Sequence, residues 1–269
     1  MRKALTCITV IDLTFILFLS ISGFFAGALG RIIYYLAFII PFLAALFIKN
    51  KTRAEFSPLG IKISGKELAL VIPIAPPTLA LVFLISWLTS LLLFFAGDGN
   101  VTDVSGNIFN VIAIHAVIPA LLEEALFRYI PIAFIAPYTK RGAVLISALF
   151  FGLVHCNLYQ LPYAFFAGVI FALTDIAFGN ILPSVILHFL NNLSSVFWLR
   201  SSAGSAFSLA YIITLAALSL ISLALILVFQ KEYKNRFLPV ISDKRKFKLS
   251  YEPIILIILT LFIAITNLV

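Results

Sequence analysis

The chain has 269 residues, 62% hydrophobic and 11% charged, with a mean hydropathy of +1.14, whereas soluble domains are roughly half apolar and a quarter charged. A soluble fold could not bury that much apolar surface, but a bilayer can, because about 20 consecutive apolar residues span its hydrocarbon core. The net charge of +8 does not indicate nucleic-acid binding, because Lys and Arg lie almost entirely in short stretches between apolar runs, a pattern that sets orientation in a membrane.

The first apolar run follows Arg2 and Lys3 and extends to Gly30. It is longer than the roughly 7–15 residue core of a cleaved signal peptide, which favours a retained first helix. Gly30 and Arg31 alone separate it from the second run. This short separation is one reason why the expected number of helices is eight or nine.

Apolar runs recur along the whole chain and predict an all-α fold, a polytopic membrane helix bundle of eight or nine transmembrane helices. The run 142–156 is short for a span. No internal repeat or low-complexity linker divides the sequence, so residues 1–269 are expected to form a single membrane domain. Cys7 and Cys156 lie in or beside apolar runs and indicate neither a disulfide framework nor a cysteine metal site. The nine runs are 4–29, 31–48, 67–96, 108–137, 142–156, 160–178, 181–199, 205–230 and 251–269.

Three clusters of basic residues indicate the orientation of the bundle. They lie in the segments 49–66, 140–141 and 231–248, and nine alternating spans place all three on one side of the membrane. The loop 97–107 falls on the other side and carries two aspartates but no basic residue. The sequence therefore predicts a multi-pass protein of the cell membrane, with a cytoplasmic N-terminus and an external C-terminus.

Few ionisable or strongly polar residues interrupt the apolar runs. A charged side chain at mid-membrane costs about 2.5–3.5 kcal/mol on insertion scales, so such residues usually face the interior of the bundle and mark function. The polar residues of the runs are Asp12, His115, Glu123, Glu124, Arg128, His155, Asp175, His188, Asn191 and Asn192.

The first polar motif is Glu123-Glu124 followed by Arg128, in the middle of a long apolar helix. Glu124 and Arg128 are four residues apart and therefore neighbours on one helix face, where we expect them to pair. Glu123 lies about 100° further round the helix and is left without a helical partner. An unpaired carboxylate at this depth is a candidate proton acceptor.

Two further motifs place imidazoles on later helices. Phe151 and His155 are four residues apart near the end of one helix, so the phenyl ring is expected to pack against the imidazole. His188 and Asn192 share one face of another helix and offer two hydrogen-bond donors. Each motif by itself is also common in structural contacts between helices.

Together and in this order, a doubled Glu with an Arg, then Phe-x-x-x-His, then His-x-x-x-Asn resemble the CPBP family. That family contains the type II CAAX prenyl proteases, such as the Ras-converting enzyme, and the bacterial bacteriocin-processing and lysostaphin-resistance proteins. The resemblance covers about residues 108–200, the expected catalytic core, and it implies an intramembrane endopeptidase. The flanking helices resemble the family in being apolar.

The resemblance divides the motif residues into two sets. A carboxylate helped by an imidazole would activate a water to attack the scissile carbonyl, and a second imidazole with an amide would donate hydrogen bonds to the oxyanion. In that order, the catalytic set is Glu123, His155, His188 and Asn192. The supporting set is Glu124, Arg128 and Phe151.

The residues leave the participation of a metal open. Glu123, His155 and His188 would make a set of two histidines and one carboxylate, the minimum for a catalytic zinc site, and the family is often described as metalloproteases. A Glu-His water mechanism needs no metal, and the His-Glu-x-x-His motif of the common zinc proteases is absent from the sequence. The metal-free mechanism is favoured, with zinc as the alternative cofactor.

Counting about 1.5 Å per residue from the basic side, Glu123 and His155 lie roughly 20 Å deep. His188 lies only about 10 Å from the turn at Gly179 and Asn180. The difference disappears if this uncharged turn is itself recessed into the protein, as irregular backbone can be where it lines a cavity. We therefore expect the catalytic set to converge on one cavity.

Two other function classes use intramembrane polar residues. In a proton-coupled transporter Asp12 and Asp175 would extend a relay, but no pair of matching Gly/Pro-broken helices suggests an inverted repeat. In a non-catalytic membrane scaffold or bacteriocin-immunity factor, the same groups would only hold helices together. We interpret Asp12, His115 and Asp175 as interhelical hydrogen-bonding residues, although His115 shares the face of Glu123 and would reach the same cavity.

The expected substrate is a membrane-associated protein or peptide, met within the lipid bilayer. A prenylated protein is implied by the eukaryotic branch of the family alone. No feature of the sequence indicates a site that recognises a prenyl group.

Overall fold

The computed structural model describes residues 1–52, 56–93, 104–201, 205–246 and 251–266. Within these ranges the chain forms helices and loops, and the β structure is an isolated bridge between Gly60 and Asn180. Seven of the described helices are long and apolar enough to cross a membrane. The chain is therefore a polytopic helical membrane protein, which confirms the predicted class.

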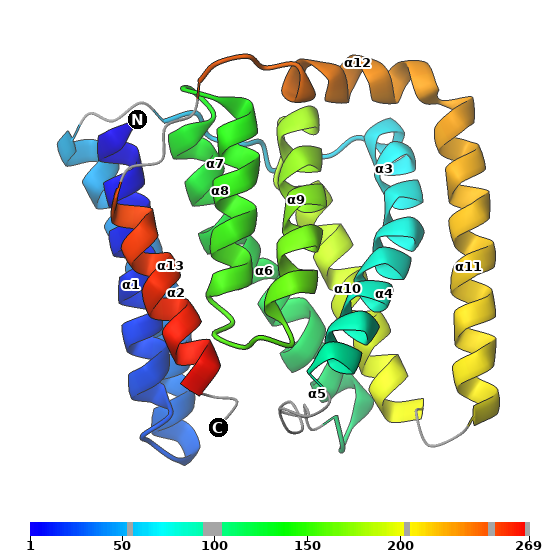
Figure 1. The fold of residues 1–269 in the computed structure, drawn as a ribbon, viewed down its shortest axis with the longest axis horizontal. Helices are drawn as coiled ribbons and strands as arrows, with labels where there is room; N and C mark the ends of the chain where they lie inside the picture. Colours follow the sequence, from blue (N-terminus) through cyan, green and yellow to red (C-terminus); the bar gives the residue numbers. More distant parts are fainter. Residues whose placement is uncertain (53–55, 94–103, 202–204, 247–250, 267–269) are drawn as a thin grey trace.

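The helices run largely side by side, except that α12 lies across one end of the bundle (Figure 1). We call this the α12 end; it also holds the N-terminus and the turn between α7 and α8. The segments α3, η1 and α4 continue one another, as do α5 to α7. The bounds are α1 Arg2–Ser22, α2 Gly27–Thr52, α3 Gly65–Val71, η1 Ile72–Ile74, α4 Ala75–Leu92, α5 Ile108–Ile112, η3 Ala113–Val117, α6 Ile118–Glu124, η4 Ala125–Tyr129, α7 Ile130–Ile135, α8 Lys140–Leu153, α9 Leu161–Phe178, α10 Leu182–Ser201, α11 Ser205–Val228, α12 Gln230–Ile241 and α13 Tyr251–Thr266.

The predicted boundary between the first two helices is wrong. The chain leaves the helix at residues 23–26, whereas Gly30 and Arg31 lie inside α2. Gly27 begins α2 with a φ of 67°, in the left-handed region that glycine adopts without strain. A Cβ at Gly30 would clash with the carbonyl group of Phe25, so glycine is needed here for the close approach of the turn to α2.

The helix in one predicted span is short. α8 has 14 residues. At 1.5 Å per residue α8 is about 21 Å long, less than the hydrocarbon core of about 30 Å. The loop between α8 and α9 consequently ends short of the ends of α2 and α10 on the side opposite α12 (Figure 1). This leaves a recess in the bundle beside the end of α8.

The segment 231–248, which the sequence predicts as a basic loop, is helical over α12. One face of α12 binds the bundle: the hydroxyl of Tyr233 donates to the carbonyl of Leu70 at 2.6 Å, and Arg236 Nη2 lies 3.5 Å from Glu67 Oε1. The exposed side carries Lys231 and Lys234 toward its start and Leu238 and Ile241 toward its end, a mixture that suits a helix lying along a membrane surface. The cluster of basic residues in the sequence therefore could not show whether this segment is a loop or a surface helix.

The turn between α9 and α10 is covered by the loop that precedes α3. The amide of Gly60 donates to the carbonyl of Gly179 at 2.8 Å, and the amide of Ile181 donates back to Gly60 at 3.0 Å. The side chain of Asn180 donates to the carbonyl of Lys62 and is 6% exposed. The turn therefore lies beneath another segment of the chain.

Prolines shape the helix that carries the first polar motif. Pro131 has no backbone N–H to donate to Phe127, four residues earlier. The carbonyl of Phe127 accepts the Ser147 hydroxyl at 2.7 Å and Nη1 of Arg128 at 3.2 Å. The π-helical turn η4 lies directly before this proline, and such turns are frequent at functional sites. Tertiary contacts thus support a helix that proline interrupts.

Close packing of α8 against α9 depends on Gly168. A Cβ at this position would lie 3.0 Å from Cα of Ala148 and 3.2 Å from Nη2 of Arg128. Small residues let membrane helices approach closely in this way. The same glycine therefore brings α9 against both α8 and the buried guanidinium.

Gly168→Leu is expected to lower the melting temperature and the yield of folded protein, because overpacking costs about 1–3 kcal/mol. Gly65→Leu is the matched control, since a Cβ at Gly65 meets nothing within 4 Å. Thermal unfolding of both purified variants in detergent measures the difference. An equal loss in the two variants would contradict the packing argument.

Candidate active site

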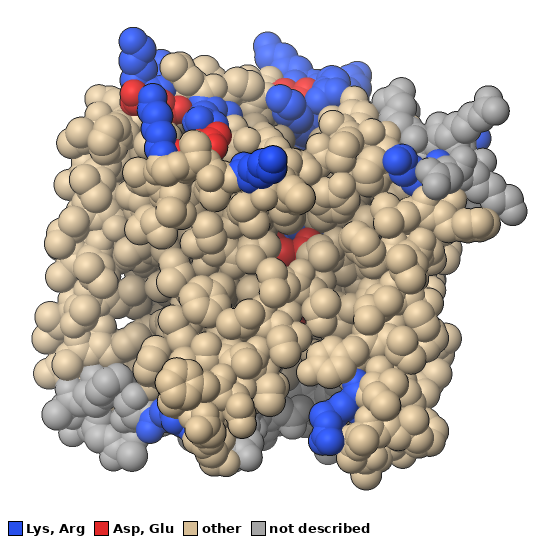
Figure 2. All heavy atoms as spheres, turned by 180° about the vertical axis from the view of Figure 1, so that it is seen from behind, with Lys and Arg blue, Asp and Glu red and all other residues tan. Residues whose placement is uncertain are grey.

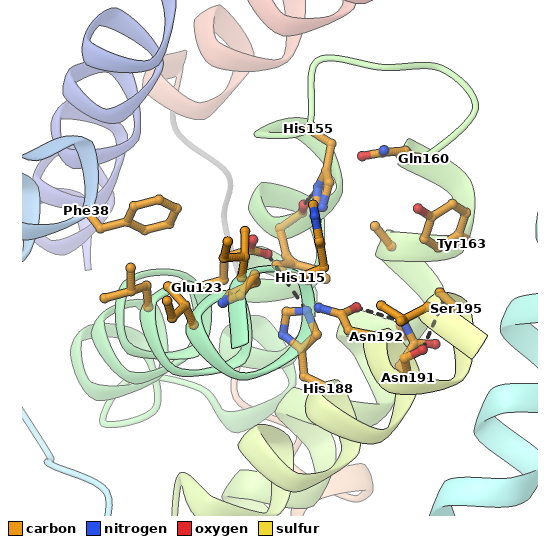
Figure 3. Close-up of a pocket in the computed structure, with 18 of the residues that line it drawn as sticks. Phe38, His115, Glu123, His155, Gln160, Tyr163, His188, Asn191, Asn192 and Ser195 are labelled. Atoms are coloured by element: carbon orange, nitrogen blue, oxygen red, sulfur yellow. Dashed lines mark hydrogen bonds and ion pairs between the residues drawn. The ribbon is translucent and has the colours of Figure 1, made fainter. Parts of the chain in front are cut away.

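A cavity of about 550 Å³ lies among α2, the α5–α7 helix, α9 and α10. Glu123, His155, His188 and Asn192 all line it, although they come from three separate parts of the chain. Figure 3 shows these side chains turned toward a shared space. The predicted convergence on one cavity is therefore confirmed.

The predicted pair of Glu124 and Arg128 is present and continues to a third residue. Arg128 Nε lies 3.4 Å from Glu124 Oε2, and both side chains are 0% exposed. Nδ1 of His188 donates to the other carboxylate oxygen, Oε1 of Glu124, at 2.8 Å. A carboxylate oxygen can only accept, so this contact leaves Nε2 of His188 free to act in the cavity. The role of Glu124 in holding His188 was not predicted from the sequence.

Aromatic rings enclose this buried chain of polar groups. The guanidinium carbon of Arg128 lies 4.0 Å from the ring centroid of Phe151 and 5.8 Å from that of Phe171. The Phe151 ring also meets the rings of His155 and His188 edge to face, at centroid distances of 5.1 and 5.4 Å. Phe151 therefore packs against His155 as predicted, and in addition against the other two polar side chains.

His155 is fixed by the end of α8. Its Nδ1 lies 2.7 Å from the carbonyl oxygen of Phe151, in the last turn of that helix. Carbonyls at a helix C-terminus lack helical partners, so the imidazole caps one of them. Because a carbonyl only accepts, Nδ1 carries the proton, and Nε2 of the neutral ring presents a lone pair.

Glu123 differs from its neighbour in both surroundings and direction. Its side chain is 16% exposed and lines the cavity, whereas that of Glu124 is fully buried. Its Oε2 lies 3.9 Å from Nε2 of His188, which is outside hydrogen-bond distance. The two adjacent glutamates thus differ in role: Glu124 supports the structure, and Glu123 faces the cavity.

The cavity also has polar residues that the sequence did not single out. Ser195 lies one turn after Asn191, and its hydroxyl donates to the Asn191 carbonyl at 3.1 Å. Gln160 and Tyr163 line the cavity from the start of α9. Ser195 follows Asn191 at helical spacing, which was a usable signal, but nothing in the sequence indicated Gln160.

Of the three residues interpreted as structural, His115 lines the cavity, whereas Asp12 and Asp175 do not. Oδ1 of Asp175 accepts the backbone amide of Ser184 at 2.9 Å and so caps the start of α10. Asp12 is 1% exposed on α1, and its Oδ2 has no hydrogen-bond partner among the described residues. The contact predicted for Asp175 is therefore present.

The described residues contain no group of three His, Cys, Asp or Glu side chains arranged to hold a metal ion. The set considered from the sequence, Glu123, His155 and His188, surrounds the cavity without forming such a group. The Nδ1 atoms of both histidines are engaged by protein acceptors.

Residues 104–194 match the family described as type II CAAX prenyl endopeptidase, Rce1-like. No curated protein and no solved structure matched the chain. The matched segment runs from the loop before α5 into α10 and contains both the catalytic and the supporting residues expected from the sequence. The resemblance to the CPBP family is confirmed over this segment.

Glu124→Gln is expected to reduce the yield of folded protein, because it leaves Arg128 as a buried unpaired charge at a cost of about 3–5 kcal/mol. The double variant Glu124→Gln with Arg128→Met removes both charges and is expected to recover much of the yield. Fluorescence-detected size-exclusion chromatography in detergent measures both. A single variant that matches the parent in yield and melting temperature would argue against the buried pair.

Proposed function

We propose that this chain, whose residues 104–194 form a domain of the Rce1-like CAAX prenyl endopeptidase family of proteases, hydrolyses a peptide bond of a membrane-associated protein or peptide within the bilayer. The observation that carries the proposal is the position of Glu123. It is a carboxylate that forms no ion pair with Lys or Arg among the described residues, lies 3.9 Å from Nε2 of His188, and faces a cavity lined by two imidazoles and an amide. In this proposal residues 108–200 are the catalytic core of a single membrane domain, 1–269.

Glu123 and His155 are the proposed water-activating pair. Glu123 removes a proton from water as its oxygen attacks the carbonyl carbon of the scissile bond. The tautomer of His155 supports a helping role, because Nε2 presents a lone pair that can orient the same water. When the tetrahedral intermediate collapses, the proton passes from Glu123 to the leaving amine nitrogen.

His188 and Asn192 are the proposed donors to the oxyanion. The amide of Asn192 can donate in any protonation state, whereas Nε2 of His188 can donate only when both ring nitrogens carry protons. The contact with Glu124 supports this role, because it holds Nδ1 and so directs Nε2 toward the cavity. The positioning residues for His188 are Glu124, Arg128 and Phe151. They do not contact the substrate in this proposal.

We favour catalysis without a metal. The support is that the described residues do not bring the carboxylate and the two histidines together as a group of metal ligands. The contacts of the two Nδ1 atoms do not distinguish the mechanisms, because they leave Nε2 of each histidine open to a water or to a metal. Zinc bound by Glu123, His155 and His188 is the alternative cofactor, and it would act by polarising the water that attacks the substrate.

The proposed topology has eight or nine spans, with the N-terminus in the cytoplasm and the C-terminus outside. Lys and Arg side chains gather at one end of the molecule, as Figure 2 shows, and few lie at the other. Positive residues favour the cytoplasmic side of a membrane protein. The α12 end is therefore assigned to the cytoplasm.

Glu123→Gln is expected to lower cleavage by at least about 100-fold while leaving a monodisperse protein, because the amide keeps the shape but cannot accept the proton. New N-termini in membranes of cells that express the parent or the variant are compared by mass spectrometry. Glu67→Gln is the matched control, since Glu67 lies on α3 outside the cavity and glutamine also forms a capping box. Parental cleavage by a folded Glu123→Gln protein would favour the scaffold or transporter instead.

Chelation distinguishes the two mechanisms. A quenched peptide built on the fastest Glu123-dependent cleavage site is incubated with purified protein, with and without 1,10-phenanthroline. We expect an unchanged rate, because no step of the proposed mechanism requires a metal. Loss of activity that added Zn²⁺ restores would instead establish the zinc mechanism.

A further inference from the structure

Basic residues define the two ends of the molecule sharply. The described parts of the basic segments 49–66, 140–141 and 231–248 all lie at the α12 end (Figures 1 and 2). At the opposite end the described chain places Arg31, in the first turns of α2, and Arg200, at the end of α10. With positive residues on the cytoplasmic side, the end with Arg31 and Arg200 faces outward.

The cavity reaches the outward end. Its lining includes Arg31, Val104, Gln160 and Leu199, which belong to the helix ends and loops on that side. The shortness of α8 creates this space, because the chain turns back at His155 before it has crossed the bundle. Irregular backbone at membrane depth is tolerated where it lines such a cavity.

Toward the α12 end the cavity is closed by packed side chains. Phe127, Arg128 and Phe171 are each 0–1% exposed, and Ser184 at the start of α10 is 0% exposed. The loop before α3 and the turn at Asn180 form a further layer over them. These packed side chains separate the cavity from the α12 end.

The two walls of the cavity differ in chemistry. One, formed by α2 and the α5–α7 helix, is mainly apolar and aromatic around Glu123 and His115, with residues such as Tyr34, Phe38 and Leu122. The other carries amide and hydroxyl groups, those of Gln160 and of Asn191, Asn192 and Ser195 on α10 (Figure 3). An extended polypeptide suits both walls, since its main chain can bond to amides while its apolar side chains pack opposite.

From these observations we infer that the cavity receives its substrate from the non-cytoplasmic side, as an extended and largely apolar polypeptide segment in the outer half of the bilayer. The inference rests on the proposed function for the cleavage step and on the charge asymmetry for the side of access. A protein tail presented at the cytoplasmic surface, prenylated or not, is then not the substrate of this site.

Access is tested by thiol labelling in whole cells, independently of catalysis. In a Cys7→Ser, Cys156→Ser background, single cysteines replace Ser195 in the cavity, Arg31 at its mouth or Lys62 at the α12 end. A small membrane-impermeant methanethiosulfonate should label the first two in intact cells and Lys62→Cys only after permeabilisation. Ser219→Cys, on α11 away from the cavity, is the matched control for Ser195→Cys and should stay unlabelled.

Labelling of Ser195→Cys only after permeabilisation, or of Lys62→Cys in intact cells, would overturn the inference. The Glu123-dependent new N-termini provide a second test, since they should lie in the outer half or on the outer flank of substrate transmembrane segments. Cleavage at the cytoplasmic flanks of substrate transmembrane segments would overturn the inference about access but would still support the proposed protease function. Absence of any Glu123-dependent cleavage would instead remove the proposed function, while labelling would still decide the side of access.

Discussion

The buried chain from Arg128 through Glu124 to His188 constrains the rest of this structure. A guanidinium inside a membrane bundle must be paired, and here it meets a carboxylate on its own helix, the carbonyls of Phe127 and Ser147, and the face of Phe151. The carboxylate then has one oxygen left, which fixes His188. The same contacts join the α5–α7 helix to α8 and α10, so the residues that stabilise the bundle also orient the site. Because Gly168 has no side chain, α9 can pack directly against the buried guanidinium of Arg128.

The length of α8 is the second constraint. A full span in its place would continue beyond His155 and occupy part of the outward half of the bundle. Because α8 stops after 14 residues, its last turn ends inside the protein, where the imidazole of His155 caps a carbonyl and faces the cavity. One feature thus supplies the recess, the position of a proposed catalytic group and the direction from which a substrate can approach.

The sequence predicted the class of fold from local rules, and it predicted the convergence of the polar motifs from their resemblance to a known family and from their similar depths. Runs of apolar residues fix helices in a bilayer, and four-residue spacing fixed the pair of Glu124 with Arg128. The contact of Glu124 with His188 could not be found this way, since it joins residues on different helices. Nor could the turn at residues 23–26, which depends on Gly27 and Gly30, or the helix α12, whose apolar face is visible only once Tyr233 has a partner. Gln160 could not be predicted as a cavity residue, because it lies in the loop after α8. That loop lines the cavity only because α8 is short.

The central claim is that Glu124 holds His188 through Nδ1, with Nε2 directed to the cavity. The chain has three histidines, so ¹⁵N spectra of histidine-labelled protein in nanodiscs can be assigned by removing His115 and His155 in turn. Nitrogen shifts distinguish protonated from unprotonated ring positions. The account predicts that Nδ1 of His188 carries a proton, and that Glu124→Gln changes the His188 signals while leaving those of His155 unchanged. An unprotonated Nδ1 on His188 in the parent protein would contradict it.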